Sequence, residues 1–193
     1  MKFNRNLFWK LIGIFAVMDL CIIMAGCGDW ESQASTIISL LGPAIQALVA
    51  ILAAFGEGVS PAVMTQFNNW AQQAQTALVN IKALIASYKA AAATAQPGVL
   101  NEIQASLTAL TSELGPILTQ LHITDPNSQD KFTAAVGAVT AFVASLIALV
   151  PAVSAAKNME AERKLADKAT ESAKQFKSDF NSAVSFFGPE YEL

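Results

Sequence analysis

Charged side chains are scarce in the middle of this 193-residue chain. Residues 32–156 contain eight of them, whereas about a quarter of the residues in an average domain are charged. Alanine, serine, threonine, asparagine and glutamine stand in their places, and the formal net charge of the whole chain is −3. Because no cluster of lysine and arginine is present to attract phosphate groups, we expect no nucleic-acid partner.

Cysteine and histidine are nearly absent. The chain has two cysteines, Cys21 and Cys27, and a single histidine, His122. His122 has no cysteine or second histidine near it in the sequence, and a metal site needs several such ligands close together. We therefore expect no metal ion and no other cofactor.

Familiar catalytic motifs are missing as well. The sequence contains no Gly-x-Ser-x-Gly, no glycine-rich phosphate loop and no His-Glu-x-x-His. Glu102 and Glu113 are eleven residues apart and could share one face of a helix, but general acid–base catalysis needs carboxylates that meet across a cleft. We expect both to be solvated, and we predict that the chain is not an enzyme.

What the sequence does have is the pattern of a secretory signal at its N-terminus. Three basic residues come first, an apolar stretch follows over residues 11–24, and Ala25 and Gly26 are small. This order of a positive region, an apolar region and small residues before a cleavage point is typical of a signal peptide.

The segment Met24-Ala25-Gly26-Cys27 is similar to the lipobox of bacterial lipoprotein precursors, in which an aliphatic residue and two small residues precede a cysteine. The resemblance covers residues 1–27 and implies that the Cys27 thiol receives diacylglycerol. It also implies that a lipoprotein signal peptidase recognises Met24, Ala25 and Gly26 and cleaves before Cys27. The alternative is an uncleaved signal anchor, for which Asp19 in the apolar stretch is the best argument.

The lipobox interpretation fixes a domain organisation and a location. It predicts a signal peptide over 1–26, a lipidated tether over 27–33, a helical domain over 34–187 and a C-terminal tail over 188–193 that frays. Cys27 would be the single cysteine of the mature chain, so no internal disulfide is expected. The protein would be membrane-anchored in a bacterial cell envelope, on its periplasmic or extracellular face, with membrane lipid as partner.

Helical periodicity dominates residues 34–187, and strand signals are nearly absent. Five helical segments follow one another, with expected interruptions at Gly42-Pro43 and Gly115-Pro116 and a break at Gln96-Pro97-Gly98. Ser60-Pro61 and Asp125-Pro126 are typical helix starts. Apolar residues recur at alternating spacings of four and three, for example at positions 100, 103, 107, 110, 114, 117 and 121. We predict an all-α antiparallel bundle of about five helices.

The first and fourth segments are apolar on nearly all sides. Residues 37–55 and 132–156 are each long enough to cross a hydrocarbon core of roughly 30 Å. The same pattern fits two central helices surrounded by the other three, which need apolar partners for their own apolar faces. We favour two central helices in a bundle that is tethered by lipid, and keep two membrane spans as the alternative.

These observations predict a location and an architecture more closely than an activity. We expect a lipid-anchored envelope protein with a non-catalytic binding, scaffolding or structural role, whose helix faces contact a partner protein or a second copy. One alternative is a membrane-embedded helical hairpin or pore formed by the two apolar segments. A further alternative is a carrier of an apolar ligand, suggested by the excess of apolar residues and the Gly-Pro kinks.

Overall fold

The computed structural model describes residues 30–88, 90–156 and 159–193, and every regular element in these ranges is helical. In chain order the elements are α2 (Trp30–Ser39), α3 (Leu41–Ala54), η1 (Gly56–Gly58), α4 (Pro61–Tyr88), α5 (Gln96–Ser112), α6 (Leu114–Gln120), α7 (Pro126–Ala155), α8 (Met159–Val184) and η2 (Pro189–Tyr191). A single residue separates α2 from α3 and α5 from α6, so each pair is one interrupted helix. The predicted all-α antiparallel bundle of about five helices is confirmed.

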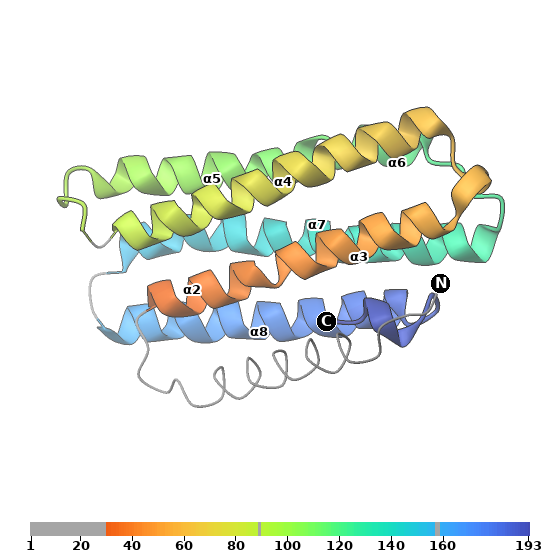
Figure 1. Cartoon of the computed structure of the whole chain (residues 1–193). Helices are drawn as coiled ribbons and strands as arrows, with labels where there is room; N and C mark the ends of the chain where they lie inside the picture. The colour runs from red at the N-terminus through yellow and green to blue at the C-terminus, as the bar shows by residue number, and fades with distance from the viewer. Residues whose placement is uncertain (1–29, 89, 157–158) are drawn as a thin grey trace, which may run out of the picture.

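The two apolar helices lie inside this arrangement (Figure 1). The α4–α5 hairpin lies on one side and α8 on the other, and the interrupted helix α2–α3 and helix α7 lie between them. Helix α7 contacts α8, α5 and α3, while α2 contacts α8 and α4. The central position of these helices follows from their composition, because each must present apolar side chains to more than one neighbour.

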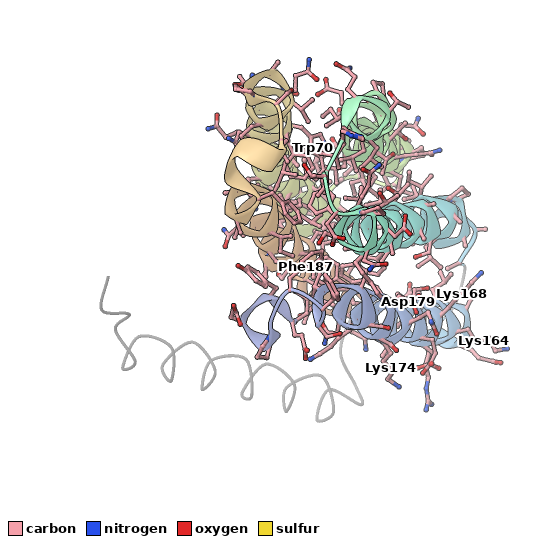
Figure 2. The ribbon with its side chains drawn as sticks, turned by 90° about the vertical axis from the view of Figure 1, so that its right-hand side faces the viewer. Trp70, Lys164, Lys168, Lys174, Asp179 and Phe187 are labelled. Atoms are coloured by element: carbon pink, nitrogen blue, oxygen red, sulfur yellow. The ribbon has the colours of Figure 1, made fainter. Side chains whose placement is uncertain are left out.

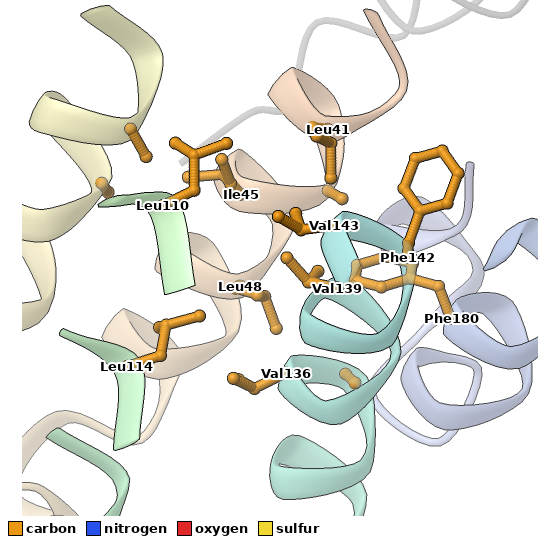
Figure 3. Close-up of a cluster of buried hydrophobic side chains, with 14 of the residues drawn as sticks. Leu41, Ile45, Leu48, Leu110, Leu114, Val136, Val139, Phe142, Val143 and Phe180 are labelled. Atoms are coloured by element: carbon orange, nitrogen blue, oxygen red, sulfur yellow. The ribbon is translucent and has the colours of Figure 1, made fainter. Parts of the chain in front are cut away.

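The core contains the apolar residues that recur at spacings of four and three. All seven apolar positions predicted for the third helix are buried, from Leu100 in α5 to Leu121 just after α6. Figure 3 shows side chains of α3, α5, α6, α7 and α8 converging on one cluster. At the α7–α8 interface the rings of Phe142 and Phe176 are stacked, with centroids 4.4 Å apart and an interplanar angle of 3°. Aromatic and aliphatic packing therefore holds the charged helix α8 onto the apolar helix α7.

Helix α4 buries a wider face than its sequence predicts. The alternating spacing of four and three predicts one buried row, formed by Val63, Phe67, Trp70, Ala74, Ala77, Ile81, Leu84 and Tyr88. Phe67 and Trp70 are buried as expected, but Ala71, Leu78 and Ile85 are buried too. These three residues form a second row beside the first. The reason is that α4 packs on one side against α5 and on the other against α2 and α3.

The two Leu-Gly-Pro sequences interrupt their helices in the same way. After the breaks at Leu40 and Glu113, Pro43 and Pro116 each occupy the third position of the helix that follows. Amide groups in the first turn of a helix lack an intrahelical acceptor, so proline removes no helical hydrogen bond there. The predicted interruptions are confirmed. Pro151, in contrast, lies inside α7, which continues to Ala155.

The α4–α5 connection differs from the prediction. Helix α4 ends at Tyr88 instead of continuing through the alanines, and Gln96, Pro97 and Gly98 form the first turn of α5 instead of a break. The Gln96 side-chain amide donates to the Tyr88 carbonyl at 3.4 Å. The side chains of residues 90–95 are exposed or half-buried, so their good helix propensity is not reinforced by packing. The antiparallel hairpin requires a turn at this point.

The C-terminal residues pack on the bundle, contrary to the fraying expected of them. Gly188 turns the chain with φ of 139°, and η2 then contacts α3 and α8. The Asn181 side chain receives a hydrogen bond from the Leu193 amide at 2.7 Å and donates one to the Leu193 carbonyl at 3.2 Å. These two hydrogen bonds hold Leu193 against α8.

Candidate functional site

The predicted lipidation motif Met24-Ala25-Gly26-Cys27 lies outside the described residues. The described chain begins with Trp30, the first residue of α2, three residues after Cys27. The start of α2 therefore marks the part of the bundle that lies nearest to Cys27 along the chain.

Five helix ends meet where α2 begins, and we call this part of the bundle the proximal end. It contains the start of α2, the end of α4 at Tyr88, the start of α5 at Gln96, the end of α7 at Ala155 and the start of α8 (Figure 1). This arrangement follows from the antiparallel connections, which bring alternate helix ends to the same side.

An apolar cavity of about 70 Å³ lies within the proximal end. Its fourteen lining residues come from α2, α4, α5, α7 and α8, and every one is an alanine, valine, leucine or isoleucine. The spacing of apolar residues predicted that Leu100, Ile103 and Leu107 of this lining face inward. It could not reveal the cavity, because the same spacing results whether facing side chains interlock or leave a gap.

The exposure of buried side chains along α7 rises toward this cavity. Val136 and Val143, farther from the proximal end, are 0% exposed, whereas Leu149 and Val150 in the cavity wall are 7% and 8% exposed. Ala34, Val153 and Leu165, which also line the cavity, are half-buried. The cavity therefore borders the surface where α2, the end of α7 and the start of α8 come together.

The opposite end of the bundle carries a helix cap. The Asp125 carboxylate accepts hydrogen bonds from the Ser128 hydroxyl at 2.6 Å and the Ser128 amide at 2.9 Å. These hydrogen bonds, that of the Ser128 hydroxyl foremost, lower the pKa of Asp125 because they favour the ionised carboxylate. The predicted start of the fourth helix at Asp125-Pro126 is confirmed. The Asp125 side chain therefore serves as the N-cap of α7.

Helix α4 donates hydrogen bonds to backbone carbonyls near both helix interruptions. The Trp70 indole N–H donates to the Leu110 carbonyl at 2.8 Å, and the Gln75 side-chain amide donates to the Gly42 carbonyl at 3.1 Å. Leu110 is among the last four residues of α5, whose carbonyls lack an intrahelical partner. Trp70 therefore has a structural role at the α5–α6 break. Nothing in the sequence predicts this contact beyond the burial expected for a tryptophan.

The other polar candidates from the sequence do not meet. His122 lies in the connection between α6 and α7, while Glu102 lies in α5 and Glu113 at the α5–α6 break, and all three side chains are exposed. Among the described residues no three His, Cys, Asp or Glu side chains are grouped closely enough to hold a metal ion.

Three exposed helix faces differ in chemistry. The outer face of α4 carries glutamine and asparagine, and that of α8 carries the charged side chains that point away from the bundle in Figure 2. On α8, Lys164 pairs with Glu160 at 2.7 Å and Lys174 with Glu171 at 2.8 Å. The outer face of α7 is uncharged from Thr133 onward, and its exposed residues are Thr133, Ala134, Gly137, Ala141, Ala144, Ala148, Pro151 and Ala155. Helix α7 is thus central but not enclosed on every side.

Comparison with protein-family models, with curated protein sequences and with solved structures finds no match for this chain. Its function is therefore inferred from the residues themselves.

Proposed function

We propose that this protein is a lipid-anchored helical component of the bacterial cell envelope with a non-catalytic binding or scaffolding role. The observation that carries the proposal is the short spacing between the lipobox-like segment and the bundle. From Cys27 to the first residue of α2 the chain advances three residues, which span at most about 11 Å. A diacylglycerol on Cys27 would hold the proximal end of the bundle beside the membrane.

The chemistry of the described residues supports a non-catalytic role. The cavity is lined by aliphatic side chains, which neither donate nor accept protons. Glu102, Glu113 and His122 are exposed on separate parts of the bundle. The uncharged outer face of α7 and the amide-rich outer face of α4 are the helix faces available to a partner protein or a second copy.

Metabolic labelling with an alkyne-bearing fatty acid tests the anchor. The native chain, expressed in a bacterium, should incorporate the label and partition with membranes. Cys27→Ser should lose the label, whereas Cys21→Ser, which changes the other cysteine, should keep it. An inhibitor of the lipoprotein signal peptidase should cause the longer precursor to accumulate. Equal labelling of Cys27→Ser and the native chain would refute the anchor.

A second candidate function, a membrane-embedded helical hairpin, is favoured by the length and hydropathy of two segments. Gln33–Ala54 and Pro126–Val153 are each long and apolar enough to cross a membrane, and 44% and 39% of their most apolar stretches are buried inside the bundle. Core helices of soluble proteins pass the same test, so this observation favours the second candidate only weakly.

The chain from residue 27 with Cys27→Ser, which contains every described helix, distinguishes the two candidates. Gel filtration and circular dichroism in detergent-free buffer should give a monodisperse, helical species if the protein is a tethered bundle. Aggregation that detergent reverses would instead favour the membrane-embedded hairpin and would contradict our proposal.

A further inference from the structure

The cavity at the proximal end admits one class of ligand by its chemistry. Its lining offers no hydroxyl, amide or charged group, so a polar ligand would lose its hydrogen bonds to water without replacement. Water itself is disfavoured there for the same reason, and apolar cavities of this kind stay dry. A hydrocarbon group is the ligand that gains from entering.

The volume of the cavity restricts the shape of that hydrocarbon. Benzene binds in an engineered apolar cavity of about 150 Å³, roughly twice the 70 Å³ present here. The cavity therefore has room for only a few carbon atoms. The end of a linear alkyl chain fits this space, whereas a ring does not.

The cavity borders the surface, so an alkyl chain could enter it, and it lies close to the proposed lipid anchor, which could supply that chain. Half-buried Ala34 and Leu165 place the cavity at the surface between α2 and α8. Ala34 lies seven residues after Cys27. Helix α2 itself begins three residues after Cys27. If Cys27 is lipidated as proposed, acyl chains lie beside the same end of the bundle.

We infer that the proximal cavity binds the terminal carbons of a linear alkyl chain. The binding follows from the apolar lining and the cavity size, and the source of the chain rests on the proposed anchor. On this inference the bundle holds a lipid chain end between α2, α7 and α8, and occupancy fills a space that aliphatic side chains leave open.

Methyl NMR of the chain from residue 27 with Cys27→Ser provides the test, with 1-octanol as the linear probe and cyclohexanol as the ring-shaped comparison. We expect 1-octanol to cause saturable shift changes at the methyl groups of Ile103 and Leu149, which line the cavity, and not at Val136 outside it. Cyclohexanol should bind at least about tenfold more weakly. Absent or unsaturable changes, changes equally large at Val136, or equal affinity for the two probes would overturn the inference.

Two variants and a matched control make the test specific. Ala166→Leu adds three carbon atoms to the cavity wall and should weaken 1-octanol binding at least about tenfold. Ala148→Leu adds the same atoms to the exposed outer face of α7 and should bind like the native chain. If Ala166→Leu fails to fold, Leu149→Ala serves instead, because the enlarged cavity should gain affinity for cyclohexanol. A folded Ala166→Leu with native affinity, or a Leu149→Ala without that gain, would refute the site.

The full lipidated chain in a bilayer nanodisc identifies the source of the alkyl chain. If a chain from the anchor or the bilayer fills the cavity, the Leu149 methyls should already show the shifts of the octanol-bound form. If they show the unbound shifts and respond to added 1-octanol, the cavity takes free chains from solution. Loss of fatty-acid labelling would refute the anchor and leave the titration of the Cys27→Ser chain intact, so the two proposals fail separately.

Discussion

Replacing Trp70 by phenylalanine should destabilise the bundle by removing one hydrogen-bond donor from the α5–α6 break. The indole N–H donates to the Leu110 carbonyl at 2.8 Å, and Trp70 is 2% exposed. Leu110 is among the last four residues of α5, whose carbonyls lack intrahelical partners. Phenylalanine retains an aromatic ring at position 70 but leaves the Leu110 carbonyl without this partner.

Two contributions set the size of the effect. Leaving a buried carbonyl without its donor costs about 1–3 kcal/mol. Loss of the larger indole ring, which packs on Phe67 with centroids 5.0 Å apart, adds about 1 kcal/mol of lost contact. We expect Trp70→Phe to lower the free energy of unfolding by about 2–4 kcal/mol.

Urea unfolding of the Cys27→Ser chain from residue 27, followed by circular dichroism, measures this loss. Phe67→Leu is the matched control, because Phe67 is also buried in α4 but its ring donates no hydrogen bond. The control should lose about 1–2 kcal/mol, because leucine leaves part of the volume of the buried ring unfilled. Hydrogen exchange should also accelerate in α6 for Trp70→Phe alone. If Trp70→Phe costs no more than Phe67→Leu, the assignment of Trp70 to the helix break is wrong.

Three further substitutions test separate local features by the same unfolding assay. Asp125→Ala should destabilise the chain at pH 7. The difference should shrink as the pH falls below about 3.8, because a carboxylate with a lowered pKa stabilises the folded state only while it is ionised; a difference that persists at pH 2 would contradict the capping role. Gly137→Ala should raise stability by about 0.5–1 kcal/mol, since Gly137 is exposed within α7 and a Cβ there meets no atom within 4 Å; a loss would show that the glycine is needed. Gly188→Ala should cost about 1–3 kcal/mol, because φ of 139° is unfavourable for alanine; an unchanged stability would mean that the C-terminal turn relaxes freely.

Short local sequence signals correctly predict where α4 and α7 begin. Ser60 and Asp125 cap α4 and α7 as expected, with Ser60 Oγ accepting the Val63 amide at 3.3 Å. The positions of Pro43 and Pro116 likewise marked two interruptions. Each of these features depends on a few adjacent residues, so each can be predicted from the local sequence alone.

Features that depend on distant residues were missed. The second buried row of α4, with Leu78 and Ile85, exists because α4 packs against more than one neighbour. The hydrogen bond from Trp70 joins residues 40 positions apart. The cavity requires five helix ends to meet without filling the space between them. The spacing of apolar residues within one helix cannot predict such contacts, or such gaps, between different helices.

Helix α7 shows why composition alone left the choice between a core helix and a membrane span open. Alanine occurs on both of its faces: Ala135 is 0% exposed, whereas Ala141 is exposed. The neighbouring helix adds what hydropathy omits. Phe176 and Phe180 of α8 are buried, and each buried phenylalanine contributes about 1.5–3 kcal/mol. The outer face of α8 is charged, so α8 could not follow α7 into hydrocarbon. A membrane-spanning α7 would leave the apolar face of α8 without its partner, and the two-span hypothesis therefore needs another protein to cover that face.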